Sequence, residues 1–341
     1  MAFELLKHIK FYLLGGLPSA SRYEQKRTRI REQHKRYEVL HESDAMKRYR
    51  ELATQTATPR NQSGLPKKEW KQLKRELTAL RKNADVVQFF KLQKGADNFK
   101  ELTSWEEFFY EDFQEKELDP IKWIVQRPSF DERLPNIQYS LAEENHLFAA
   151  EAKNLQLTGH SLQIFTKKEP EPAEGVVFSN EFGFVPAQRN FTSGIISTGE
   201  NCKLLYGKIE AKVKFFSSSK YVFHAIWMAA GGRLPHINIL RKGSKLEFSS
   251  FAQNKDKTQQ HADLWSAGTL RQNTYYIVQL IWNKDRIEWY INGKKMFSAP
   301  NTIHEPMFLT FSSGVLGGNP RSETPSVFEI DWVSISSPCG F

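Results

Sequence analysis

The spacing of apolar residues changes once along the chain, about a third of the way from its beginning. Before that point they recur at helical intervals in a basic background, as where Tyr23, Ile30 and Tyr37 follow one another seven residues apart. Residues 54–66, rich in Thr, Asn, Ser, Gly and Pro, predict a loop, and Pro66 is expected to begin another helix. The apolar face of that helix comprises Trp70, Leu73, Leu77 and Leu80.

The rest of the chain alternates with a period of two and is rich in β-branched and aromatic residues, which predicts strands with one buried face. Asn292-Gly293 between two such runs predicts a hairpin turn, because both residues tolerate positive φ. Many short strands without long helices between them are typical of a sandwich or jelly roll. We therefore predict a mainly β jelly roll at 105–341 and an α-helical module at 1–100. The alternating runs are 155–157, 161–165, 207–215, 276–282, 286–291, 307–311 and 327–335.

The formal charge of +9 is unevenly distributed. Residues 1–100 carry 23 Lys and Arg against 11 Asp and Glu, whereas 101–341 carry 25 against 28. Whatever the helical module contacts therefore need not be what the β region binds. We expect a protein partner bound through the basic helices at 21–92, with a solvated helix surface as the simpler alternative. No helix-turn-helix, zinc-finger or RNA-binding signature accompanies the basic residues, so nucleic-acid binding is not expected.

The beginning of the chain shows no membrane-spanning pattern, because no run approaches the ~18–20 apolar residues that crossing a bilayer requires. Residues 11–17 followed by 18–21 loosely resemble a signal peptide, but the preceding segment mixes acidic and basic residues. Residues 3–14 instead place apolar side chains along one helical side, which favours an amphipathic docking helix with possible membrane-surface contact. Cys202 and Cys339 have no metal or redox spacing. We favour a cytoplasmic over a secreted location.

Several blocks of the chain, in this order, closely resemble the family 16 glycoside hydrolases. The resemblance covers about residues 105–336 and implies a concanavalin A-like β-jelly roll and, for ordinary members, retaining hydrolysis of β-glucans or β-galactans. The blocks are 109–123, 192–198, Tyr206–Lys214, Ala225–Met228, Pro235–Arg241, Ile281–Gly293 and 311–318.

The active strand of this family reads Glu-x-Asp-x-x-Glu, and His236, Asn238 and Arg241 stand at its three acidic positions here. The frame is kept, because Ile239-Leu240 supplies the extra residue of a β-bulge before Arg241. Asparagine does not ionise and arginine stays protonated, so neither replaces a carboxylate in double displacement. A histidine base would have no partner acid on the strand. We therefore expect no catalytic residue at these positions.

Acidic residues elsewhere are weaker candidates for catalysis. Glu247 and Asp263 are the nearest acidic candidates, and Glu200 or Glu210 is expected on a neighbouring strand. A lone acid on a strand is usually part of a solvated face, and none of the four is preferred as a catalytic group.

The degenerate cleft still suits sugar binding, because sugar rings stack on aromatic faces and their hydroxyls need polar partners. Arg241 beside His236 predicts a cationic floor and an anionic sugar, and Trp227 has a core role as its alternative. The resemblance also implies a structural Ca²⁺ at Asp112 and Asp331, without an oxygen-rich loop to support it. The predicted carbohydrate-binding residues are Tyr221, Phe223, Trp227, His236, Asn238, Arg241 and Trp265.

Three functions follow from these observations. The leading hypothesis is a non-catalytic carbohydrate-recognising or scaffold protein that binds a polysaccharide or oligosaccharide. An active endo-acting β-glycoside hydrolase with a rearranged site is the first alternative. A structural assembly component that docks through its N-terminal helices is the second.

Overall fold

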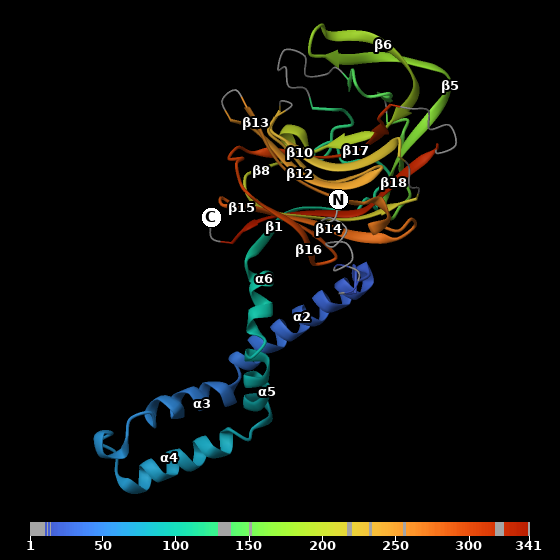
Figure 1. Cartoon of the computed structure of the whole chain (residues 1–341). Coiled ribbons are helices and arrows are strands. Elements are labelled where there is room, and N and C mark those ends of the chain that lie inside the picture. The colour runs from blue at the N-terminus through green and yellow to red at the C-terminus, as the bar shows by residue number, and fades with distance from the viewer. Residues whose placement is uncertain are drawn as a thin grey trace. The chain divides into compact units, whose positions relative to one another are not determined.

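The computed structural model describes residues 11, 13, 15–128, 138–149, 152–216, 220–231, 234–254, 257–317 and 324–339. The chain forms two compact units (Figure 1). One is Ser21–Trp105, and the other is Met1–Ala20 together with Glu106–Phe341.

The smaller unit is helical. Leu40, Met46, Val86 and Phe89 form its buried cluster, which joins α2, α3 and α5. Side chains cap two of its helices, since Ser43 accepts from the amide of Met46 and Asn83 accepts from the first turn of α5. None of the described helices is long and apolar enough to cross a membrane. The elements are α2 (Ala20–His41), α3 (Asp44–Gln55), η1 (Arg60–Gln62), α4 (Lys67–Leu80), α5 (Ala84–Gln93), η2 (Ala96–Phe99) and α6 (Lys100–Thr103).

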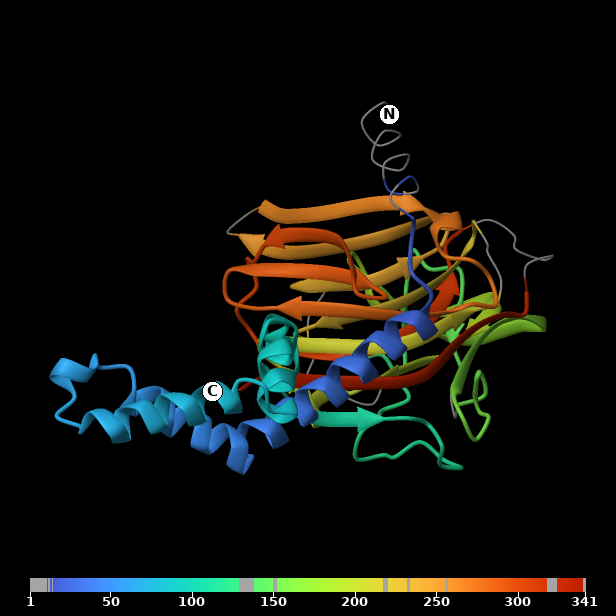
Figure 2. The same ribbon diagram turned by 90° about the horizontal axis from the view of Figure 1, so that it is seen from below.

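The larger unit is a sandwich of two sheets (Figures 1 and 2). One sheet has the order β16-β15-β14-β9-β18-β5-β6-β3, with β1, β2 and β4 pairing beside this path. The other has the order β13-β12-β11-β10-β17-β7, with β8 pairing with β17. Apolar side chains from both sheets form one core, which contains Trp282, Trp289 and Phe311. The fold is the predicted jelly-roll sandwich with N-terminal helices.

The strands of the larger unit have the following bounds. They are β1 (Trp105–Glu111), β2 (Ser140–Leu141), β3 (Leu147–Phe148), β4 (Leu155–Leu157), β5 (Leu162–Ser179), β6 (Gly183–Ser193), β7 (Ile195–Ser197), β8 (Lys203–Leu204), β9 (Gly207–Phe215), β10 (Val222–Ala229), β11 (His236–Lys242), β12 (Lys245–Asn254), β13 (Lys257–Ser266), β14 (Tyr275–Trp282), β15 (Arg286–Ile291), β16 (Lys294–Pro300), β17 (Met307–Val315) and β18 (Ser326–Pro338). Two short 3-10 helices, η3 (Gly199–Asn201) and η4 (Ala267–Thr269), lie between strands.

The predicted hairpin at Asn292-Gly293 is confirmed. Both residues have positive φ, 48° and 74°, and they join β15 to β16. The side chain of Asn292 also accepts from the amide of Ile277 on β14 and donates to the carbonyl of Pro18. The side chain of this turn residue therefore connects β14 to the segment around Pro18.

The described residues before Ser21 group with the β unit and not with the helices. Phe11 is buried against Trp265, with ring centroids 4.9 Å apart, and Lys294 lies over the Phe11 ring. Lys294 also donates to the carbonyl of Gly16. The rest of the predicted docking helix at 3–14 lies outside the described residues, apart from Leu13, which is exposed.

Candidate functional site

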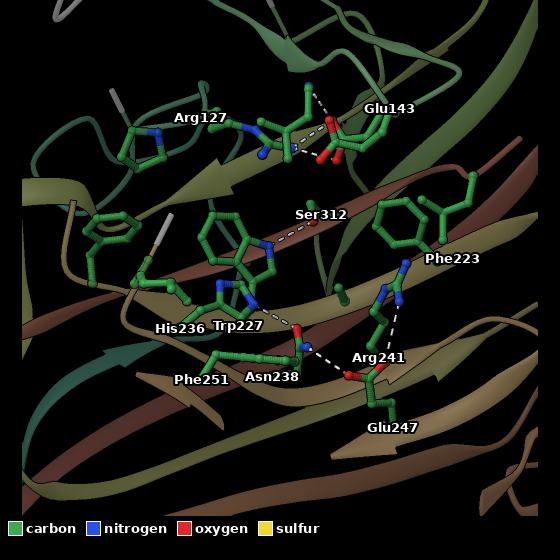
Figure 3. Close-up of a pocket in the computed structure, with 18 of the residues that line it drawn as sticks. Arg127, Glu143, Phe223, Trp227, His236, Asn238, Arg241, Glu247, Phe251 and Ser312 are labelled. Carbon is green, nitrogen blue, oxygen red and sulfur yellow. Dashed lines mark hydrogen bonds and ion pairs between the residues drawn. The ribbon is translucent and has the colours of Figure 1, made fainter. Parts of the chain in front are cut away.

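A pocket of about 470 Å³ opens on the sheet that contains β10, β11, β12 and β17 (Figure 3). Its volume is in the range of small-molecule sites. The three positions singled out in the sequence, His236, Asn238 and Arg241, all line it. The described lining residues are Arg127, Pro128, Tyr139, Leu141, Glu143, Glu144, Phe223, Ala225, Trp227, Ala229, Leu234, His236, Asn238, Arg241, Glu247, Phe251, Phe308, Ser312 and Leu316.

The predicted β-bulge brings these three residues to one face. On β12, Asn238 pairs with Ser249 and Arg241 pairs with Glu247, so three steps on β11 match two on its partner. The extra residue returns Arg241 to the face of Asn238. The side chains of Ile237, Ile239 and Leu240 are buried in the core. The bulge prediction is confirmed.

A chain of hydrogen bonds crosses the pocket floor. His236 Nε2 lies 2.9 Å from Asn238 Oδ1, and Asn238 Nδ2 donates to Ser249 Oγ over 2.9 Å and to Glu247 Oε1 over 3.3 Å. Ser249 in turn donates to Glu247 Oε1 over 2.7 Å. Because the amide oxygen only accepts, Nε2 of His236 carries its proton. His236 and Asn238 are thus bonded to one another, and Asn238 is also bonded to Glu247.

His236 is held as a neutral ring. Burial lowers its pKa to about 4, although the hydrogen bond to Asn238 acts in the opposite direction. Its ring stacks on Trp227 with centroids 5.2 Å apart, and Trp227 Nε1 donates to Ser312 Oγ over 3.0 Å. At neutral pH, His236 is therefore a neutral imidazole held in place by its hydrogen bond to Asn238, and it is not a protonated acid.

Arg241 is also fixed on two sides. Its guanidinium lies 3.4 Å from Glu247 and 4.9 Å above the ring centroid of Phe223. Phe223 itself is only 7% exposed and meets His146 at its edge. Phe223 therefore lines the pocket but presents little ring surface for a sugar, because it is nearly buried and Arg241 lies over its ring. The aromatic lining residues with more accessible surface are Trp227 and Phe251.

The opposite side of the pocket comes from a segment that the sequence did not single out. Arg127 Nη2 donates to both carboxylate oxygens of Glu144, over 2.8 and 2.9 Å, and the amide of Leu141 donates to the same carboxylate. Burial would raise the pKa of Glu144, but the charges of Arg127 and His146 and these hydrogen bonds hold it below its usual value. Figure 3 shows Glu143 beside this pair. Nothing in the local sequence pattern indicates that this segment faces β11.

Two predicted sugar-binding residues lie elsewhere. Trp265 is 4% exposed, belongs to the core and donates to Asp263 over 2.9 Å, so it presents little ring surface for a sugar. Tyr221 lines a smaller hollow that shares Phe223, Arg241 and Glu247 with the main pocket. Tyr221 thus stays near the site, at its margin.

The expectation of a cationic floor is not supported. The described lining residues include two arginines and three glutamates, and each arginine is paired with a glutamate. His236 adds no charge at neutral pH, because its pKa is lowered to about 4. An anionic sugar therefore has no unpaired cation to bind among these residues.

The predicted calcium residues are engaged with side chains. Asp331 pairs with Lys212 over 2.8 Å, and Asp112 accepts from Gln114 over 3.1 Å. Within the described part of the chain, no group of three or more His, Cys, Asp or Glu residues is arranged to hold a metal ion. Calcium remains a prediction that rests on the resemblance alone.

Comparison with known proteins decides the family. Residues 143–334, more than half of the chain, match glycosyl hydrolases family 16. The chain belongs to this family. The matched region contains β11 with His236, Asn238 and Arg241, and also Glu143, Glu144 and Glu247. The family 16 fold is therefore present, and its bulged strand β11 carries His236, Asn238 and Arg241 on the pocket floor.

Similar proteins include glucanases. The chain is 24% identical over 183 residues to glucan endo-1,3-beta-glucosidase A1 from Niallia circulans, a match that spans 42% of this chain and 26% of that protein. The laminarinase catalytic domain from Thermotoga petrophila RKU-1 has a TM-score of 0.54 at 18% identity, over 70% of this chain and 100% of that one. The endo-β-1,3-glucanase from Pyrococcus furiosus has a TM-score of 0.52 at 15% identity, over 69% and 95%. These structures share the fold.

Proposed function

We propose that this family 16 protein binds a neutral β-linked glucan or oligosaccharide without hydrolysing it. The observation that carries the proposal is the bonding of the pocket floor, where His236 is bonded to Asn238, and Asn238 and Arg241 both contact Glu247. Retaining hydrolysis requires one carboxylate as nucleophile and a second as proton donor, ~5–5.5 Å apart. The side chains of β11 include no carboxyl group for either role.

The same floor supports binding. Trp227 has part of its surface accessible, and its indole is oriented by Ser312 and His236. The polar side chains of His236 and Asn238 line the same pocket. Sugar hydroxyls bind such groups, and the C–H faces of sugar rings stack on aromatic side chains. Because these side chains are already fixed, little side-chain entropy is lost on binding. The named glucanases among the similar proteins suggest laminari-oligosaccharides as the first ligands to test.

Calorimetric titration with laminari-oligosaccharides tests the proposal, with reducing-sugar release measured on the same samples. We expect saturable binding without release, and a loss of affinity of about ten-fold or more for Trp227→Ala. Phe182→Ala is the matched control, because Phe182 is 70% exposed and lies outside the pocket. Absence of binding in the wild-type protein, or equal binding by the two variants, contradicts the proposal.

A second candidate is a hydrolase with a rearranged site. Glu247 places one carboxylate on the floor, directly across from Arg241, and Figure 3 shows Glu143 on the opposite side of the pocket. If this pair acts, Glu247→Gln abolishes reducing-sugar release and leaves oligosaccharide binding in place. The proposal of binding alone predicts no release from either protein.

A further inference from the structure

One face of α4 carries a row of basic side chains, none of which lines the pocket described above. At 100° per residue, the basic side chains of this helix fall within an arc of about 120° and span about 12 Å of its length. They form the α4 basic face, which consists of Lys67, Lys68, Lys71, Lys74 and Arg75.

The α4 basic face is not neutralised within the chain. The two acids of α4, Glu69 and Glu76, lie on the other side of the helix, and Glu76 is bonded to Arg48 of α3 over 2.7 Å. None of the five cations has an ion-pair partner in the described part of the chain, and four of the five are exposed. The face thus presents a dense positive charge to its surroundings.

The apolar side of α4 is already used. Leu77 is buried, and α4 packs along α3, where Arg48 bridges the two helices. Insertion of an apolar helix face into a bilayer is therefore not available to this helix. Trp70 lies beside the basic face, with Lys74 Nζ 5.2 Å from its ring centroid. The α4 basic face therefore offers a partner positive charge, and the apolar side of the helix is not free to enter that partner.

We propose that the α4 basic face docks on an anionic lipid bilayer at the level of its headgroups. All five cations lie within one arc of the helix, so they can face a flat bilayer surface at the same time. Each lysine near an anionic bilayer adds its own share to the electrostatic attraction. Four of the five are lysines. Lysine is depleted in protein interfaces, and arginine is preferred where phosphate or nucleic acid is recognised by paired hydrogen bonds. A lysine-rich face therefore favours lipid over the protein partner expected for 21–92 as a whole.

Co-sedimentation of the full-length protein with phosphatidylcholine vesicles, with and without phosphatidylserine, tests the proposal. We expect binding only to vesicles that contain phosphatidylserine, weakening as salt is added. The triple variant Lys67→Gln, Lys68→Gln, Lys71→Gln should lower partitioning about 100-fold, because each lost charge costs about five-fold. These positions are exposed and leave the contact between Lys74 and Trp70 in place.

The matched control removes the same net charge from other helices through Lys35→Gln, Lys91→Gln and Lys94→Gln, all exposed positions. It should bind phosphatidylserine vesicles as the wild-type protein does, and circular dichroism should show the same helix content in all three proteins. Equal losses in the two triple variants would mean that overall charge, not the α4 face, is responsible. No binding to anionic vesicles, or tighter binding to a duplex RNA oligonucleotide through the same lysines, overturns the proposal.

Discussion

The indole Nε1 of Trp289, on one sheet of the sandwich, donates to the main-chain carbonyl of Asn238 on the other over 2.9 Å. Asn238 stands where the β-bulge interrupts the pairing of β11 with its neighbours. A buried carbonyl without a partner costs about 1–3 kcal/mol. The hydrogen bond from Trp289 thus stabilises the backbone that positions the pocket floor.

Substitution Trp289→Phe should lower the free energy of unfolding more than Trp282→Phe. Both tryptophans are fully buried, but Trp282 Nε1 has no hydrogen-bond partner among the described residues. The two changes remove the same side-chain volume, and only the first leaves the carbonyl of Asn238 unpaired. We expect a difference of about 1–2 kcal/mol in urea denaturation. Equal effects would show that the bond contributes nothing.

A carboxylate at position 241 should destabilise the pairing of β11 with β12. Arg241→Glu places a carboxylate directly across from Glu247, and like charges at such a cross-strand position destabilise by up to ~1 kcal/mol. Adding Glu247→Gln should recover most of that loss. The double-mutant cycle in urea denaturation measures the interaction. A single Arg241→Glu variant as stable as the wild-type protein would mean that the pair is not coupled.

Three histidines with lowered pKa values, His146, His224 and His236, make the folded state sensitive to acid. Burial lowers the pKa of His224 to about 3 and that of His236 to about 4, and the ordinary value is near 6.5. Between pH 6.5 and these values the unfolded chain binds more protons than the folded chain does. The contribution of these histidines to the free energy of unfolding is therefore complete above pH 6.5 and is lost as the pH drops. Each histidine changes stability by up to ~1.4 kcal/mol per pH unit.

The variant His224→Gln checks this pH dependence. His224 is bonded to Ser313 over 2.8 Å and Ser326 over 3.1 Å, and glutamine keeps polar atoms without titrating. We expect the variant to be less stable at pH 7 and to lose less stability between pH 6.5 and 5. That range lies above the usual carboxyl pKa values, so the histidines dominate it. The same slope in both proteins would exclude His224 as its source.

The ion pair beside the pocket supports a further comparison. Glu144→Gln leaves the largely buried guanidinium of Arg127 without its carboxylate partner, and breaking a buried pair costs about 3–5 kcal/mol. Glu143→Gln, at the exposed neighbouring position, should change stability by less than about 1 kcal/mol. Thermal unfolding and oligosaccharide titration of both variants measure the effects. Equal stabilities of the two variants contradict this role of Arg127 and Glu144.

Much of the fold could be predicted because its strands alternate cleanly. The predicted runs 207–215 and 286–291 coincide with β9 and β15, and the bulge before Arg241 lies where expected. The long pair β5 and β6 was only partly predicted. Pro170 and Pro172 interrupt the alternation within β5, where the register with β6 shifts between Lys168 and Ala173, because proline cannot donate to the ladder.

The candidate site was predictable on its own strand and less so across strands. Spacing placed His236, Asn238 and Arg241 on one face, since strand periodicity and the bulge are local properties. Whether a side chain from another segment meets that face depends on tertiary packing, which one sequence does not reveal. Arg127 was missed for that reason. The sequence also did not show that Glu247 lies across from Arg241 and pairs with its charge, so that the pocket floor lacks the expected unpaired cation.

Ligand-observed NMR of the wild-type protein with laminaritriose tests the central claim most directly, because one sample reports both binding and cleavage. The floor of paired His236, Asn238, Arg241 and Glu247 predicts saturation transfer from the protein to the sugar and no new anomeric proton signals over time. New reducing-end anomeric signals that disappear in the Glu247→Gln variant would show that hydrolysis survives, and an absence of saturation transfer would show that the pocket does not bind this glucan.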